Sequence, residues 1–311
     1  MARHRIEAWI PSIIPRDRIL SASSSDGIHF ERDSGIRLEG QTFLRQTMVY
    51  FPFIHRLAVG YWRMYYHQSS KEKGWWNSQL LSAVSDDCLN WQREPGTRLG
   101  TGPEGERRHF RSPCIVPFRG ENLLFYCAAS DGVHFQPHRV ESEDGLNFSA
   151  SRSMALGKLG NVLDVHVVNM GEQYLRAYFT CDREIYSAVS ADALSWDLER
   201  GTRMTANDVQ AGGRVDNPSV VQLADGTCRL YFRALEKGPI GGRIYSAVSE
   251  DGLDFAVESG VRLDCSGPFE RHGVGFPHVF PMGRAWKMYY VGYWGRHLLA
   301  PWTLRHWRDR E

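Results

Sequence analysis

The chain has 311 residues, 42% of them hydrophobic and 23% charged, which is enough apolar material for one sizeable core or two modest ones. Its 37 Lys and Arg residues balance 36 Asp and Glu residues, and this argues against a nucleic-acid binder and against a disordered acidic chain. No apolar run reaches the roughly 20 residues that cross a bilayer, and the N-terminus lacks the apolar stretch of a secretory signal. We therefore expect a cytoplasmic protein with reduced cysteines and with no membrane or nucleic-acid partner.

A motif with the consensus S-x-D-G-L-x-[FW] occurs five times. Its copies occupy residues 24–30, 85–91, 142–148, 190–196 and 249–255. Asp and Gly are typical of tight turns, because the Asp side chain binds nearby backbone amides and Gly adopts positive φ. The motif thus predicts a turn between two strands, and its aromatic residue begins the second strand and fills the space between neighbouring sheets.

Two strand patterns alternate with these turns. The first is apolar with a proline near its start, at 51–54, 112–115, 164–167, 217–220 and 276–279, with Val165 replacing the proline in the third copy. The second is rich in aromatic residues, at 63–66, 123–126, 176–179, 229–232 and 287–290. Proline at the start of a strand costs no central ladder bond, so both patterns are compatible with a sheet.

A period of about 40 to 60 residues with strand chemistry is typical of propeller blades. We predict an all-β fold in which residues 1–311 form one five-bladed β-propeller. The blades are expected at about 45–99, 105–152, 160–204 and 212–263, with a fifth made of 272–294 plus 19–38. The N-terminal strands would complete the last blade and close the ring.

The proline strand, the R-M-Y-Y strand and the S-x-D-G-L-x-W turn, repeated over nearly the whole chain, resemble one clan of five-bladed glycoside hydrolases. That clan contains arabinanases and xylosidases, invertases and levansucrases, and mannoside phosphorylases. The resemblance implies a central funnel lined by the residue before each proline, where three carboxylates serve as base or nucleophile, as support and as acid. Glycosidic chemistry needs two carboxylates roughly 5 to 10 Å apart.

The five funnel positions of this chain are Phe51, Ser112, Asp164, Asn217 and Phe276. Only Asp164 keeps a carboxylate in register. An aromatic residue replaces the first-blade carboxylate, and the second blade reads R-S-P where invertases have R-D-P. The three-carboxylate mechanism therefore does not transfer position by position.

Strand starts converge on the axis of a propeller, so the ionisable residues near them are candidates for one site. The catalytic candidates are Asp164, Asp216, Glu270, His166 and His278. The substrate-binding candidates are Tyr50, Phe51, His109, Arg111, Arg214, His272 and Phe276, with Trp75 and Trp76 as a platform for a sugar face. Each has a structural alternative: strand caps or inter-blade ion pairs for the charged residues, and packing for the histidines and tryptophans.

Three functions stay open at this point. The first is a glycosidase-like enzyme that cleaves or transfers a glycosidic bond, with Asp164 and either Asp216 or Glu270. The second is a lyase, cyclase or isomerase acting on a small metabolite, which the apolar first blade favours, and the third is a binding module. We expect no cofactor, because the spacing shows no H-x-x-x-H metal pattern, although some of the resembled hydrolases place a calcium ion on the axis near a histidine.

Overall fold

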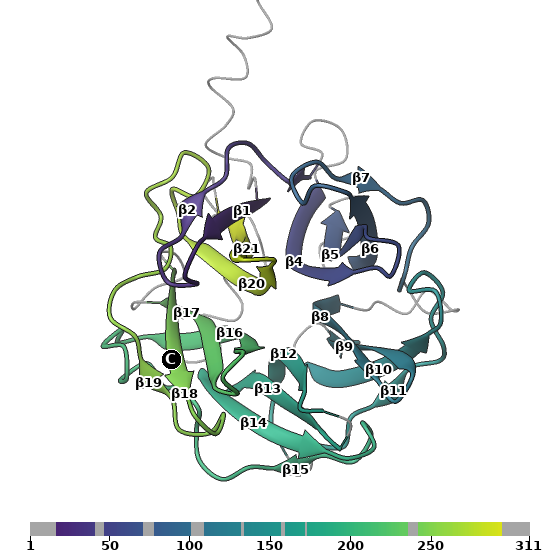
Figure 1. Ribbon diagram of the computed structural model, residues 1–311. Helices are drawn as coiled ribbons and strands as arrows, with labels where there is room; N and C mark the ends of the chain where they lie inside the picture. The colour runs from purple at the N-terminus through teal and green to yellow at the C-terminus, as the bar shows by residue number, and fades with distance from the viewer. Residues whose placement is uncertain are drawn as a thin grey trace, which may run out of the picture.

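The computed structural model describes residues 17–40, 47–70, 78–100, 109–131, 134–156, 159–171, 173–235 and 242–293. These residues form 21 strands and no helix, arranged as five sheets around a central axis (Figure 1). The predicted all-β, five-bladed propeller is confirmed. Within the same ranges, nothing resembles a helix that could traverse a bilayer.

Each blade is an antiparallel sheet whose innermost strand faces the axis (Figure 1). Blade one contains β4 (Thr47–Arg56), β5 (Trp62–Ser70), β6 (Ser78–Ser85) and β7 (Gln92–Arg93). Blade two contains β8 (His109–Phe118), β9 (Glu121–Ala129), β10 (Gln136–Ser142) and β11 (Arg152–Ser153). Blade three contains β12 (Val162–Asn169), β13 (Leu175–Cys181), β14 (Glu184–Ser190) and β15 (Asp197–Leu198). Blade four contains β16 (Arg214–Gln222), β17 (Cys228–Leu235), β18 (Arg243–Ser249) and β19 (Ala256–Val257).

The fifth blade joins the two ends of the described chain. Its inner strands are β20 (Val274–Met282) and β21 (Ala285–Gly292), and its outer strands are β1 (Arg18–Ser24), β2 (Glu31–Arg32) and β3 (Leu38–Glu39). Strand β1 pairs with β21 along its whole length, from Arg18 opposite Gly292 to Ser24 opposite Trp286. The ring is thus closed by N-terminal strands, as the offset of the repeats predicts.

The repeated turns owe their shape to their Ser and Asp side chains. In the first copy, Ser24 Oγ accepts the backbone N–H of Gly27 at 3.0 Å, and Asp26 Oδ1 accepts those of Ile28 and His29 at 2.8 Å each. The other four copies repeat the two Asp contacts. Bonds from backbone N–H groups lower the pKa of the Asp251 carboxyl to about 2. The turn aspartates are therefore structural.

The aromatic residue of each motif fills the space between neighbouring blades. In all five copies its ring lies edge-on to an aromatic ring of the preceding blade, with centroids 5.7 to 6.3 Å apart. The pairs are Phe30 with Tyr231, Trp91 with Tyr289, Phe148 with Tyr65, Trp196 with Phe125, and Phe255 with Tyr178. The repeat therefore predicts the packing between sheets as well as their number.

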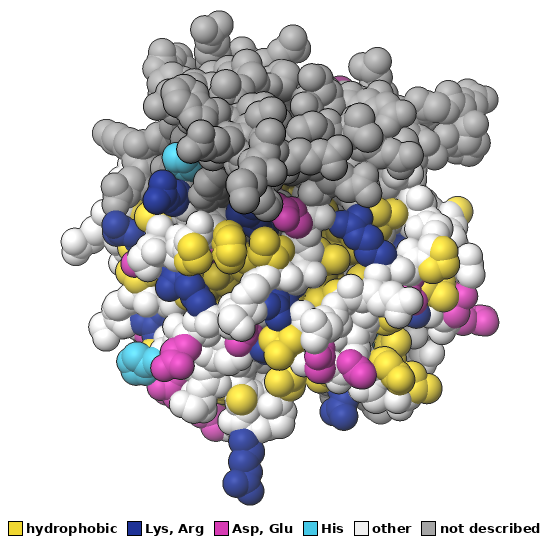
Figure 2. Space-filling model, turned by 90° about the horizontal axis from the view of Figure 1, so that it is seen from above, with side chains coloured by type: hydrophobic (Ala, Val, Ile, Leu, Met, Phe, Trp, Pro, Cys, Tyr) yellow, Lys and Arg dark blue, Asp and Glu magenta, His cyan; other side chains and the backbone are white. Residues whose placement is uncertain are grey.

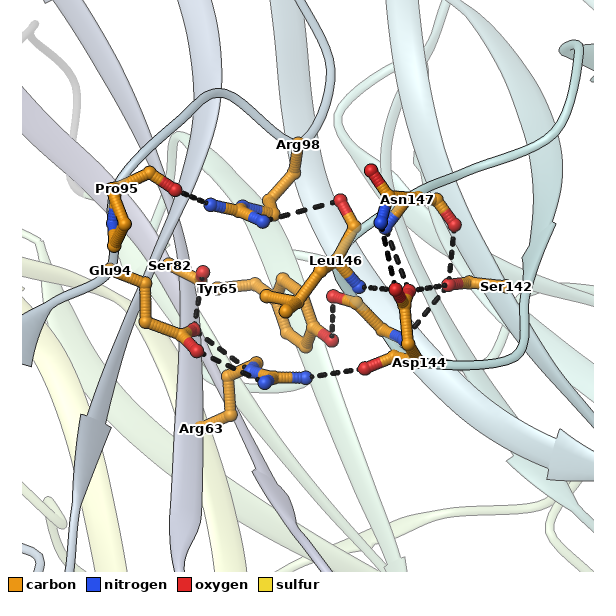
Figure 3. A network of polar contacts seen from close by, with 11 residues as sticks. Arg63, Tyr65, Ser82, Glu94, Pro95, Arg98, Ser142, Asp144, Leu146 and Asn147 are labelled. Atoms are coloured by element: carbon orange, nitrogen blue, oxygen red, sulfur yellow. Dashed lines mark hydrogen bonds and ion pairs between the residues drawn. The ribbon is translucent and has the colours of Figure 1, made fainter.

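A polar latch accompanies this packing, as Figure 3 shows for blades one and two. Tyr65 Oη donates to the carbonyl of Gly145 at 2.8 Å, and Arg63 Nη1 donates to that of Asp144 at 2.9 Å. Glu94 holds the Arg63 guanidinium with bonds of 2.8 and 3.0 Å. Tyr178, Tyr231 and Tyr289 hold the turns of blades four, five and one in the same way. Blade two has Phe125 at this position, so its junction with blade three lacks the hydroxyl.

The core lies between the sheets and is rich in aromatic side chains from the second strands. All six cysteines are free, and all except Cys265 are buried. Burial raises the pKa of the Cys114 thiol to about 12, so it packs as a small apolar group. In the side view of Figure 2, basic and acidic side chains of the described residues are interspersed with apolar ones.

Every innermost strand carries a bulge where the proline motif lies. The ladder to the second strand shifts register between Tyr50 and Phe53, and the other four inner strands shift at the equivalent place. Four residues that precede a proline have positive φ, between 48° and 55°; they are Phe51, Ser112, Asn217 and Phe276. Bulges re-aim side chains, and here they fall at the residue before each proline.

Candidate active site at the propeller axis

The five residues at the bulges meet around the axis. Asp164 Oδ1 accepts from Ser112 Oγ at 2.9 Å, and its Oδ2 accepts from Asn217 Nδ2 at 2.8 Å. Asn217 Oδ1 in turn accepts the backbone N–H of Phe276 at 3.2 Å, and the Phe276 and Phe51 ring centroids are 4.0 Å apart. Because each residue comes from a different blade, the contacts surround the axis. We call these five residues the axial ring.

Asp164 is the carboxylate of the axial ring. It is 2% exposed and accepts a third bond, from Arg111 Nη2 at 3.2 Å. The Arg111 guanidinium carbon lies 5.2 Å from the centre of the Phe51 ring and 5.1 Å from that of Phe135, which fixes its plane. The buried Nε of Arg111 makes no hydrogen bond. Eight other arginines of the described residues share this feature, so it does not distinguish Arg111 as a ligand-binding residue.

Asp216 lies one residue before the axial ring in blade four. It is buried, and Arg233 grips it with two bonds of 2.6 and 2.7 Å, while Arg214 Nε lies 3.0 Å from its Oδ2. Burial alone raises the pKa of the Asp216 carboxyl, but the charges of Arg233 and Arg214 outweigh it and lower that pKa below its ordinary value. Asp216 is therefore an anion at neutral pH and a poor proton donor.

Glu270 does not reach the axis, and the expectation that it partners Asp164 is not met. Its buried carboxylate accepts from Arg32 Nε at 2.5 Å and from Tyr290 Oη at 3.3 Å. Arg32 belongs to β2, the outermost strand of the fifth blade, so this contact stabilises the closing sheet. The nearby His272 is half-buried, and its backbone N–H donates to the carbonyl of Tyr293 at 3.0 Å.

His166 and His278 lie two residues beyond the axial ring and join neighbouring inner strands. His166 Nε2 is 3.1 Å from the carbonyl of Val220, and His278 Nε2 is 3.1 Å from that of Ile54. A carbonyl only accepts, so each Nε2 carries its hydrogen. Burial lowers the pKa of these imidazoles to about 4 and about 3, so both are neutral. Each thus links two neighbouring inner strands. Both line an apolar opening of about 400 Å³, and Asp164 is not part of its lining.

The axial calcium ion that the resemblance leaves open finds poor support in these side chains. Calcium prefers six to eight oxygen ligands, whereas His166 and His278 direct N–H groups at backbone carbonyls. Over the described ranges, no group of three or more His, Cys, Asp or Glu side chains is placed to hold a metal. We therefore assign no catalytic step to a metal.

The remaining described candidates lie on the inner strands of blades one and two. Tyr50 contacts the rings of Phe51, His67 and Phe276, with centroids 6.1 to 6.3 Å apart. His109 lies 5.3 Å from His67, measured between ring centroids. Trp75 and Trp76 lie outside the described residues. Tyr50, Phe51, Arg111, Asp164, Asp216, Arg214 and Phe276 are thus brought into one connected cluster at the axis.

Sequence reasoning missed Arg233 and His67. Both directly follow the aromatic pair of the second strand, and both face a residue next to the bulge, Asp216 and Tyr50 respectively. The repeat contains a usable signal, because this position varies between blades while the position before it is aromatic in all five. Its residues are His67, Cys127, Thr180, Arg233 and Val291.

Comparisons with known proteins agree with the architecture. No family model matches the chain, and no curated protein matches it. Among solved structures, an endo-arabinase from Bacteroides thetaiotaomicron superposes with a TM-score of 0.61 at 15% identity, covering 80% of this chain and 94% of its own. A thermostable family-43 glycoside hydrolase gives 0.60 at 16%, covering 79% and 89%. A protein described as a glycoside hydrolase gives 0.61 at 11%, covering 96% and 97%. The chain thus has the fold of five-bladed glycoside hydrolases.

Proposed function

We propose that this chain is a glycosidase-like, carbohydrate-active enzyme that cleaves or transfers a glycosidic bond at the axial ring. The observation that carries the proposal is the position of Asp164, which lies where all five blades meet and is oriented by side chains from blades two and four. Its place in the repeat is one where resembled hydrolases carry a carboxylate. The fold shared with glycoside hydrolases supports the same reading.

We assign different roles to Asp164, which belongs to the axial ring, and to Asp216, which lies one residue before the ring in blade four. A group that transfers a proton has to reach the reacting oxygen. Asp164 lies in the axial ring, where we place the reaction, so it is the carboxylate that would act on the glycosidic bond. Asp216 is held as an anion by two arginines, so its role is to orient Arg233 and Arg214. Arg111, packed between two aromatic rings, presents fixed positive charge beside Asp164.

One observation favours the second candidate, a lyase, cyclase or isomerase. The rings of Phe51 and Phe276 are in contact on the axis, where the resemblance implies the first-blade carboxylate. A site with one proton-transfer group, fixed cations and an apolar wall suits chemistry that stabilises an anion without activating water. Both the glycosidase-like enzyme and the lyase, cyclase or isomerase are compatible with this fold, so the chemical identity of the reaction product decides between them.

The test measures products from arabinan, xylan, levan and mannan, using reducing-end release and mass spectrometry. We compare the wild type with Asp164→Asn and with a matched surface variant, Glu250→Gln, whose side chain is exposed in a turn. We expect Asp164→Asn to lose activity by about a hundredfold or more and Glu250→Gln to keep it. Circular dichroism confirms that each variant is folded. Full activity in Asp164→Asn contradicts the proposal, and an unsaturated or isomerised product without hydrolysis favours the second candidate.

A further inference from the structure

His67 lies beside the axial ring, and its two ring nitrogens have no partner. The residue is 1% exposed, and neither Nδ1 nor Nε2 makes a hydrogen bond. Its ring centroid lies 5.8 Å from that of Phe51, a member of the axial ring, and it faces Tyr50 across the ladder. Among the neutral side chains that the structure describes, His67 alone has two buried polar atoms without a partner. Such a group calls for a specific explanation.

The fold does not require a histidine at this position. The equivalent residue of the second strand is Cys127 in blade two and Val291 in blade five, and both are fully buried. An apolar side chain thus fills the same place in the same kind of sheet. Two unsatisfied nitrogens lower stability, and such violations are expected where function requires the residue. The comparison between blades therefore indicates that His67 serves a ligand and not the packing.

The surroundings of His67 favour an uncharged ligand group. Burial, and then the charge of Arg111, lower the pKa of His67 to about 3, so the ring is neutral at neutral pH. A neutral imidazole offers one N–H donor and one acceptor nitrogen. Hydroxyl groups can satisfy both, whereas a carboxylate has no hydrogen to donate to the acceptor nitrogen and a cation is repelled by Arg111.

Two partly exposed side chains lie between this histidine and solvent. The centroid of the half-buried His109 ring is 5.3 Å from that of His67. The Arg111 side chain, which packs on the Phe51 ring, is 15% exposed. Both nitrogens of His67 are covered in this structure, so a ligand oxygen reaches them when one of these neighbours turns aside.

We infer that His67 forms a subsite for sugar hydroxyl groups beside the axial ring, where its N–H donates to one hydroxyl oxygen and its other nitrogen accepts the O–H of another. The inference rests on the proposed function for its ligand, a carbohydrate, and adds a binding residue and the chemical group that this residue recognises. A site built to hydrogen-bond a hydroxyl discriminates strongly, because its buried polar atoms stay unpaired with any ligand that lacks the group.

The test measures binding by calorimetry for one trimer each of arabinose, xylose, fructose and mannose. The variants are His67→Phe, which keeps a ring but no nitrogen, and His67→Gln, which keeps a donor and an acceptor. His29→Phe is the control, because the His29 side chain is 86% exposed in a turn. We expect the trimer that binds the wild type most tightly to bind His67→Phe at least about tenfold more weakly, and the other two variants within about threefold of the wild type.

Two further readouts separate a contact with the ligand from a structural effect. Urea unfolding should show that His67→Phe is at least as stable as the wild type, so that lost affinity does not reflect lost folding. In protein labelled with a nitrogen isotope in histidine, the magnetic resonance signals of the ring nitrogens that disappear in His67→Phe should shift when the wild type binds the trimer.

The outcomes separate the inference from the proposed function. Equal binding by the wild type and His67→Phe overturns the inference, and so does an equal loss in His67→Gln, an unshifted His67 signal or the absence of binding by every trimer. The proposed function then stands if a polysaccharide is cleaved. Binding that depends on His67 without cleavage of any polysaccharide supports the inference, whereas the proposed function fails.

Discussion

Replacing His67 with phenylalanine should stabilise the protein, and more so in acid. The His67 side chain is 1% exposed, and neither ring nitrogen has a hydrogen-bond partner. Its ring neighbours are Tyr50, Phe51 and His109, with centroids 5.3 to 6.1 Å away. Burial, helped by the charge of Arg111, lowers the pKa of His67 to about 3. Phenylalanine has a similar shape and removes both orphaned nitrogens.

The size of the effect follows from proton linkage. The pKa of His67 is about 6.5 in the unfolded chain, so between pH 6.5 and 3 the unfolded state binds a proton that the folded state excludes, and stability falls as the pH falls. At pH 5, about 1.5 units below the unfolded pKa, this costs about 2 kcal/mol, and at pH 7 almost nothing. At pH 7 the substitution should still raise the free energy of unfolding by about 1 to 3 kcal/mol, because it removes two unsatisfied polar atoms. Any packing strain reduces this gain.

Urea unfolding followed by tryptophan fluorescence at pH 7 and pH 5 measures both parts. His67→Gln is the matched control, since glutamine stays polar but does not titrate. Both variants should gain about 2 kcal/mol over the wild type on going from pH 7 to pH 5, and only phenylalanine should also gain at pH 7. If the difference from the wild type is the same at both pH values, the reasoning about a neutral buried imidazole is refuted.

Three further substitutions test the fold and the axial ring. Tyr231→Phe removes the hydroxyl that donates to Gly27 at 2.7 Å and should lower the free energy of unfolding by about 1 kcal/mol in urea titrations; no change would show that the latch is not stabilising. Asn217→Asp places a second carboxylate beside Asp164 and should destabilise the protein at pH 7 with partial recovery near pH 4, and a loss independent of pH would contradict charge repulsion as its cause. Gly252→Ala forces a methyl group to within 2.6 Å of a buried hydroxyl at a positive φ and should lower the melting temperature by several degrees; an unchanged melting curve would show that the turn can yield.

The architecture could be predicted because its information is local and repeated. Ser24, Asp26 and Gly27 form their turn from contacts within a few residues. The Ser and the Asp return in every blade, and Cys88 and Ala193 replace the Gly in blades one and three. Their number sets the number of blades, and the offset between turns and strands predicts that β1 joins β21. Turn geometry and strand alternation depend on residues that are close in the sequence, so these patterns predict the turns and strands directly.

The sequence by itself also placed Asp164, because it occupies the repeat position that precedes a proline in the other four inner strands. It could not place Glu270, whose partner Arg32 comes from the opposite end of the chain. Nor could it show that His278 donates to a carbonyl of blade one. Only the tertiary structure decided these contacts, because each depends on which side chain of one blade faces which atom of the next. Each bulge shifts the pairing between the first and second strands of a blade by one residue. The spacing of residues in the sequence does not show which side chains this shift turns toward the next blade.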